Sequence, residues 1–207
     1  MSSDLKCNQL VSKETMNLVK ETWAKVGTML LVSHVLEVYM QNNGNGLMNK
    51  KWAQASLFTL LGFTVYDVVI RPMVRIQMEN KDLEVAVNNA INVSTMLIVA
   101  RGLESLMDGG QTKFDEQWIQ SSLYTVLGFM AYDLVTKKFV PEVQEKYRIA
   151  VNTAVQFATM FLVSRLLVDK PLNDHAFLKS SAYVLVGFAS YDLVIAKMIG
   201  EKDIRVY

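Results

Sequence analysis

Three aspartates, Asp67, Asp133 and Asp192, stand near the ends of long apolar stretches of the sequence. A carboxylate inside a membrane is energetically costly and usually marks a functional site, such as a proton relay or an ion pathway. Three equivalent carboxylates around one axis could line the path of a cation or a proton. This chemistry would fit a small channel or transporter.

The same acids also fit a structural role, in which each carboxylate is paired near the boundary of the membrane. A basic residue follows each acid by four or five positions, and a spacing of four places two side chains on one face of a helix. Two asparagines at the start of other apolar stretches could also donate to the carboxylates. Anchoring and packing is the preferred interpretation, and the ion pathway stays open. The candidate partners are Arg71, Lys137, Lys197, Asn88 and Asn152.

Each aspartate ends a copy of one motif, Gly-Phe-x-x-Tyr-Asp, which occurs three times. The copies lie in "SLFTLLGFTVYDVVIR" (56–71), "SLYTVLGFMAYDLVTK" (122–137) and "SAYVLVGFASYDLVIAK" (181–197). In a helix, the small residues of each copy fall on one stripe with the glycine and the tyrosine, and such stripes let membrane helices pack closely. The residues predicted to pack or anchor are Gly62, Tyr66, Asp67, Gly128, Tyr132, Asp133, Gly187, Tyr191 and Asp192.

A second element precedes each motif, with the pattern Thr-Met-x-x-Val beginning at Thr28, Thr95 and Thr159. Two ordered elements that recur at a period of about sixty residues indicate duplicated supersecondary units. We therefore predict an all-α fold of three repeated two-helix hairpins, with six membrane-spanning or membrane-embedded helices. The expected segments are a polar N-terminal segment (1–18), hairpin repeats (19–75, 85–140 and 149–199) and a C-terminal tail (200–207).

The apolar elements have nearly the length that a membrane helix needs. Residues 85–100 and 149–164 contain no charged residue, and residues 118–136 contain only Asp133. At about 1.5 Å per residue these are helices of roughly 24 to 28 Å, against a bilayer core of about 30 Å. The upstream elements also carry a polar face, such as Asn88 with Asn92, which could line an aqueous path or make hydrogen bonds between helices. The first upstream element carries the most charge and is the weakest span.

The basic residues give an orientation. If all six elements span, both termini and the connectors between hairpins lie on one side, which holds fourteen of the lysines and arginines against seven on the other. Basic residues favour the cytoplasmic face. We therefore expect an integral membrane protein whose termini are on the cytoplasmic, or inner, side.

Composition excludes several classes of function. The chain has 207 residues, a net charge of +1 and a mean hydropathy of +0.20, which gives no case for a nucleic-acid partner. Cys7 is the only cysteine, so neither an internal disulfide nor a cysteine-based zinc site can form. The sequence has no His-Glu-x-x-His, no phosphate-binding loop and no nucleophile elbow. We expect no enzyme activity, no metal, no cofactor and no small-molecule substrate.

This general character resembles the membrane and minor capsid components of large icosahedral DNA viruses with an internal lipid layer, such as those that infect algae. The resemblance rests on a small, cysteine-poor, multi-span chain without an enzyme motif. It implies a location in a virion internal membrane, with capsid proteins as partners. The leading hypothesis is therefore a structural membrane protein that acts as a scaffold or anchor in a larger assembly. A channel or transporter, and a soluble helical interaction protein, are the alternatives.

Overall fold

The computed structural model describes residues 12–41, 49–74, 76–168 and 174–198, and this part of the chain is helical without β-strands. The predicted all-α class is thus confirmed, with six main helices. They are α1 (Lys13–Gln41), α2 (Lys50–Val65), α4 (Lys81–Met107), α5 (Glu116–Leu134), α6 (Glu145–Leu167) and α7 (His175–Ser190). The short segments are η2 (Tyr66–Ile70) and α3 (Arg71–Met73) after α2, η3 (Thr136–Phe139) after α5, and η4 (Tyr191–Ile195) and α8 (Ala196–Met198) after α7.

Each repeat contributes one upstream and one downstream helix: α1 and α2, α4 and α5, α6 and α7. The tail expected at 200–207 lies outside the described residues, as do residues 1–11 of the polar segment expected at 1–18; helix α1 already begins at Lys13. The Tyr-Asp pair of the motif begins a π-helical turn in the first and third repeats, whereas α5 ends just after it and continues into a 3-10 turn. The motif therefore marks the point where each downstream helix changes its winding.

Asparagine and aspartate side chains fix where several of these helices begin. Asn49, Asn80, Asp115 and Asp174 each accept a hydrogen bond from a main-chain N–H in the first turn of α2, α4, α5 and α7. These short side chains satisfy donors that have no partner within the helix. The local sequence thus sets the start of all three downstream helices.

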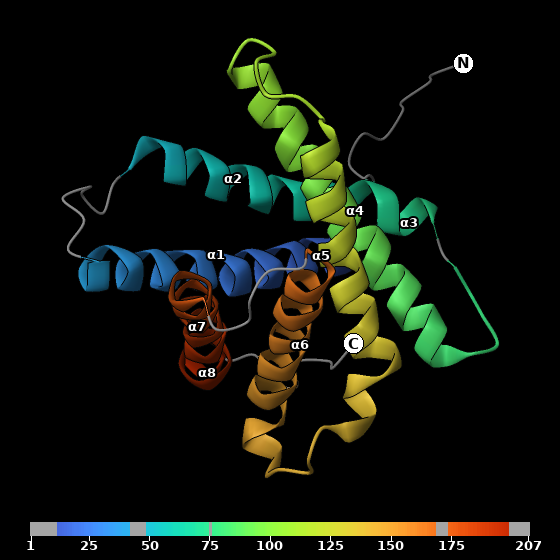
Figure 1. The fold of residues 1–207 in the computed structure, drawn as a ribbon. Helices are drawn as coiled ribbons and strands as arrows, with labels where there is room; N and C mark the ends of the chain where they lie inside the picture. Colours follow the sequence, from blue (N-terminus) through green and yellow to red (C-terminus); the bar gives the residue numbers. More distant parts are fainter. Residues whose placement is uncertain (1–11, 42–48, 75, 169–173, 199–207) are drawn as a thin grey trace, which may run out of the picture.

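The hairpins are joined in a ring. Helix α2 packs along α4, α5 along α6, and α7 along α1, so each downstream helix packs against the upstream helix of the next repeat. The last repeat returns to the first through α7 and α1. Figure 1 shows the three hairpins running in different directions and crossing one another near the middle of the molecule. This arrangement has pseudo-threefold symmetry.

The motif glycines lie where the paired helices cross. A Cβ atom on each glycine would be only 2.6–2.7 Å from a main-chain atom of a methionine in the facing helix, so an alanine side chain has no room. Each of these methionines belongs to a Thr-Met-x-x-Val element, so the two repeated patterns contact each other across hairpins. The pairs are Gly62 with Met96, Gly128 with Met160, and Gly187 with Met29.

Among the residues that the structure describes, four helical segments are long and apolar enough to cross a membrane, which supports part of the six-helix prediction. They are Lys50–Met73, Lys81–Met107, Tyr147–Leu167 and His175–Met198. Helices α1 and α5 are not among them. Charged residues such as Glu21 and Lys25 interrupt α1, and α5 has only 19 residues and opens with Glu116 and Gln117.

Candidate binding cavity at the centre of the hairpins

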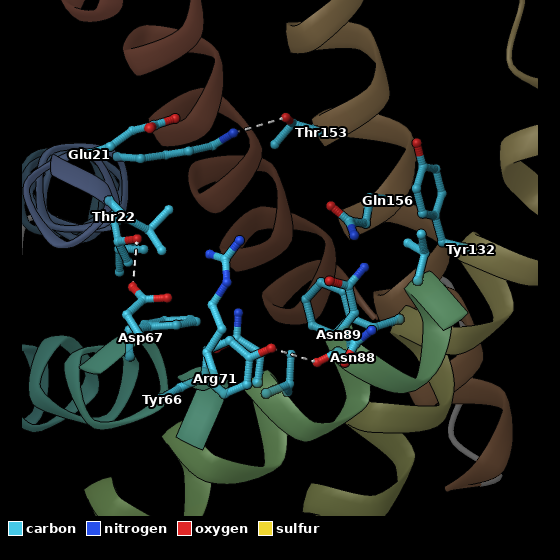
Figure 2. A pocket seen from close by; sticks show the side chains of 18 of the residues that line it. Glu21, Thr22, Tyr66, Asp67, Arg71, Asn88, Asn89, Tyr132, Thr153 and Gln156 are labelled. Carbon is cyan, nitrogen blue, oxygen red and sulfur yellow. Dashed lines mark hydrogen bonds between the residues drawn. The ribbon is translucent and has the colours of Figure 1, made fainter. Parts of the chain in front are cut away.

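The polar faces of the three upstream helices meet at one cavity of about 640 Å³ (Figure 2). This volume lies within the range of about 300 to 1,000 Å³ that is typical of small-molecule sites. The sequence left open whether these faces line a polar space or bind neighbouring helices, and they do both. The polar lining residues of α1, α4 and α6 include Glu21, Thr22, Lys25, Glu84, Asn88, Asn89, Asn92, Asn152, Thr153 and Gln156.

Aromatic rings form another part of the wall. Phe63, Phe129 and Phe188 each follow a motif glycine, and all three line the cavity. Phe157 joins them: its ring stacks on Phe188 with 4.1 Å between centroids and meets Phe129 edge-on at 5.3 Å. Phe129 also belongs to the apolar cluster with Val93 and Met160. The motif phenylalanines therefore connect the polar cavity to the apolar core.

Two of the three aspartates bind the upstream helix of their own hairpin. The Thr22 hydroxyl donates to Asp67 at 3.1 Å, and the Asn89 amide donates to Asp133 at 2.8 Å. Thr22 and Asn89 occupy equivalent positions in the repeat, six residues before the threonine of Thr-Met-x-x-Val. The same contact thus holds the first and second hairpins together.

The third aspartate is bound differently, by a lysine from another repeat. Lys25 Nζ lies 3.3 Å from Asp192 Oδ1, donates to the Thr153 hydroxyl at 3.4 Å, and sits 6.0 Å from the centroid of the Phe188 ring. Thr153 is the equivalent of Thr22 in the third repeat. Lys25 therefore joins α1 to both α6 and η4 at the place where the ring closes.

Of the aspartate trio, only Asp67 lines the cavity. Asp133 and Asp192 are buried, and the side chain of Asp192 has no exposed surface. Hydrogen bonds and the ion pair with Lys25 tie the three carboxylates to the upstream helices α1 and α4. Of the basic residues expected as partners, Arg71 in α3 and Lys137 in η3 act electrostatically on Asp67 and Asp133, and Lys197 lies in α8. Arg71 projects into the cavity in Figure 2.

The other motif residues take part in the wall or in packing. The Tyr66 hydroxyl donates to the main-chain oxygen of Asn88 at 3.3 Å, and Tyr132 also lines the cavity. Tyr191 is fully buried. The Asn88 side chain donates to the main-chain oxygen of Glu84 in its own helix. The amide that donates to Asp133 is that of the next residue, Asn89. Asn152 lines the cavity.

The importance of Lys25 and Thr22 was missed at the sequence level. The signal was present in the repeat alignment: Lys25 stands where the second and third repeats have Asn92 and Gln156. A single cation at an otherwise uncharged repeat position indicates a contact that breaks the symmetry. Because the alignment does not show which hairpins face each other, its partner Asp192 could not be named.

At the loop end of each hairpin, opposite the central cavity, a residue of the upstream helix packs on an aromatic residue of the downstream helix. His34 stacks on Trp52 with 4.2 Å between ring centroids, and the guanidinium of Arg165 lies 4.6 Å from the centroid of Phe177. Arg101 lies 5.9 Å from the ring of Trp118 in the second hairpin. These contacts close each hairpin beside its loop, and cation–π attraction adds to two of them.

Asp174 adds a charge effect at the loop of the third hairpin. The main-chain N–H of Phe177 and the guanidinium of Arg165 both bind this carboxylate, and they hold the pKa of Asp174 below its ordinary value of 3.8. A carboxylate with a lowered pKa stabilises the fold above its ordinary pKa, and this contribution is lost as the pH falls through the lowered value.

We therefore expect Asp174→Asn, which keeps a helix-capping side chain, to lower the melting temperature at neutral pH. The difference from the wild type should shrink as the pH drops below 3.8. Thermal unfolding of both proteins from pH 7 to pH 2 measures this difference. A difference that stays constant over this range would show that the charge of Asp174 is not its cause.

Comparisons with models of protein families, with curated proteins and with solved structures found no match for this chain.

Proposed function

We propose that this protein is an integral membrane protein with a structural role, a scaffold or anchor within a larger assembly. The observation that carries the proposal is an inverted distribution of polarity. The interior holds buried acids, with Asp133 only 1% exposed, while large apolar side chains face outward. Leu31, Ile98 and Leu123 are each more than half exposed, on α1, α4 and α5. Each of the six main helices exposes large apolar side chains, and lipid is the solvent that suits such a surface, since water-soluble monomers rarely expose large contiguous apolar patches.

The ring supports the embedding of all six helices. Helices α1 and α5, which are less apolar, pack along α7 and α6, and both of those are long and apolar enough to span. At about 1.5 Å per residue, the 29 residues of α1 and the 27 of α4 exceed the roughly 30 Å core of a bilayer. Tilted helices accommodate such excess length.

The contacts of the aspartates favour the structural role over the channel. Asp133 and Asp192 are buried and bind neighbouring helices, so they act as ties between helices. The polar cavity beside Asp67 favours the alternative function, a channel or transporter with a cation or proton path. Ion flux into liposomes that is lost in the triple Asp→Asn protein would favour a channel over a scaffold.

As a scaffold, the protein would present its loops and ends to other proteins of the assembly. The resemblance to viral membrane and minor capsid proteins makes a virion internal membrane the proposed location, with capsid proteins as the partners. The excess of basic residues on the side of the termini supports termini on the inner, or cytoplasmic, side.

Two measurements test the membrane placement together. After alkaline carbonate washing, the protein should stay with the membrane pellet and should need detergent for release. The native Cys7 should react with a membrane-impermeant maleimide only after the cells are permeabilised. In a Cys7→Ser background, Gln111→Cys in the loop between α4 and α5 should react in intact cells. Release by the alkaline wash would contradict the membrane proposal, and the reverse labelling pattern would contradict the orientation.

A further inference from the structure

The ammonium group of Lys25 shows what kind of ligand the cavity wall can hold. A carboxylate, a hydroxyl and an aromatic ring surround it, from Asp192, Thr153 and Phe188. A carboxylate and a hydroxyl accept the N–H groups of an ammonium ion, and the face of an aromatic ring attracts its charge. We call these three residues the Asp192 subsite. The chain itself supplies the cation for this subsite.

The pseudo-threefold symmetry repeats this set of groups in the first hairpin. The equivalent residues are Asp67, Thr22 and Phe63, and all three line the cavity. We call them the Asp67 subsite. The upstream helix that faces it is α4, where the position of Lys25 is taken by Asn92. The first repeat therefore offers the same carboxylate, hydroxyl and ring without a lysine from the facing helix.

Asn92 supplies an independent sign of a ligand. It lines the same cavity, and within the described part of the chain its Oδ1 atom is buried and accepts no hydrogen bond. A buried acceptor without a donor costs free energy, and such atoms normally have a partner. A ligand N–H group held by Asp67 would satisfy it once the Asn92 side chain turns its Oδ1 atom toward the cavity.

The cavity also holds a cationic side chain that a ligand must accommodate. Arg71 projects into it, one helical turn after Asp67 (Figure 2). A guanidinium group binds phosphate and carboxylate oxygens well. We propose that the cavity binds a small zwitterion, whose primary ammonium group occupies the Asp67 subsite and whose phosphate or carboxylate lies toward Arg71.

Such a ligand has two sources. One side of the cavity lies at the end of the fold where the connector between the first two hairpins runs, since Val74, Ile76 and Gln77 line it. In the proposed membrane placement this end is at the level of the lipid headgroups. The ligand is either a dissolved zwitterion or the ethanolamine headgroup of a lipid.

A calorimetric titration of the detergent-solubilised protein tests the chemistry with soluble probes. We expect glycerophosphoethanolamine to bind at least about tenfold more tightly than glycerophosphocholine, because a trimethylated ammonium has no N–H to donate to Asp67 and Asn92; a factor of ten is about 1.4 kcal/mol. Glycerol 3-phosphate, which lacks the ammonium, should bind no better than glycerophosphocholine. Equal binding of the first two probes, or no binding of the first, would overturn the proposal.

The symmetry provides a variant that should block the subsite without removing a wall residue. Asn92→Lys places a lysine where the first repeat has Lys25, and its ammonium should enter the Asp67 subsite. We expect binding of glycerophosphoethanolamine to weaken at least about tenfold with no loss of thermal stability. Gln117→Lys is the matched control, since it adds the same charge at an exposed position of α5 that does not line the cavity. An equal loss of binding in both variants would refute the assignment to Asp67.

Asp67→Asn gives a second readout if Asn92→Lys does not fold. It should weaken binding of the zwitterion by a similar factor, whereas Asp82→Asn, which removes an exposed charge at the same end of α4, should leave binding unchanged. Unchanged binding by Asp67→Asn would overturn the proposal. Because these titrations are done in detergent, their failure would leave the membrane proposal untouched.

Reconstitution into lipid nanodiscs separates the two sources. If a lipid headgroup is the ligand, the soluble probe should bind in discs of phosphatidylglycerol and fail to bind in discs of phosphatidylethanolamine. If the ligand is a dissolved zwitterion, the probe should bind equally in both. If the probe binds in neither kind of disc, the embedded protein does not bind the zwitterion and the proposal is contradicted.

Discussion

Gly128→Ala should destabilise the protein by about 2 kcal/mol, although alanine is the better helix former. The added Cβ would lie 2.7 Å from Met160 Cα and 2.8 Å from its main-chain oxygen, so α5 and α6 would have to separate. Overpacking of this kind costs roughly 1 to 3 kcal/mol or more, and the gain in helix propensity offsets about 1 kcal/mol of it. The free energy of unfolding, measured by denaturant titration in detergent, gives the result.

Gly102→Ala is the matched control. Gly102 also lies within a long helix, α4, but its added Cβ would meet no atom within 4 Å. This variant should be neutral or more stable by up to about 1 kcal/mol. Gly62→Ala and Gly187→Ala should behave like Gly128→Ala, because all three glycines make the same close approach. If Gly128→Ala were as stable as Gly102→Ala, the close crossing of α5 and α6 would be refuted.

The second large effect is expected at the closure of the ring. Lys25→Met removes the cation beside Asp192, whose side chain is fully buried, and leaves that carboxylate without its ion pair. Removing one partner of a buried pair costs about 3 to 5 kcal/mol. Because the Lys25 side chain is 26% exposed, we expect a loss at the lower end, about 3 kcal/mol of the free energy of unfolding.

A double-mutant cycle separates the ion pair from other effects of Lys25. In Lys25→Met with Asp192→Asn, no buried charge remains unpaired, so the double variant should recover most of the stability that Lys25→Met loses. Lys81→Met serves as the control, since the Lys81 side chain is 77% exposed and its ion pair with Glu84 should contribute less than about 1 kcal/mol. Additive losses in the double variant would show that Lys25 and Asp192 are not coupled.

Local patterns in the sequence predicted the all-α class and the six main helices well. Runs such as residues 118–136, with a single charge, have few alternatives to a buried or membrane helix, and Gly-Phe-x-x-Tyr-Asp is conspicuous because it recurs with its spacing intact. The polar face with Asn88 and Asn92 was also visible from helical spacing. Each of these features depends on residues within about one helix length.

The contacts between hairpins could not be predicted in the same way. Gly62 meets Met96 in the next repeat, and Lys25 meets Asp192 at the opposite end of the described chain. Each helix of a repeated hairpin can bury its apolar face against the other helix of the same hairpin or against a helix of a neighbouring hairpin. The sequence pattern is identical in both cases. Spacing along the chain predicted Arg71 and Lys137 as charge partners of the aspartates, and their charges do act on Asp67 and Asp133. The same spacing is silent about facing helices.

The closed ring makes the three hairpins equivalent in a way that a linear stack of repeats is not. In a linear stack the first and last units each have an exposed face, whereas here the contact of α7 with α1 repeats the contacts of α2 with α4 and of α5 with α6. Three separate copies of one hairpin would form the same ring as a homotrimer, because closed cyclic assemblies satisfy every interface. Covalent fusion of such copies frees each one to diverge, and a single chain can then carry one lysine, at Lys25, that an identical trimer would have to carry three times.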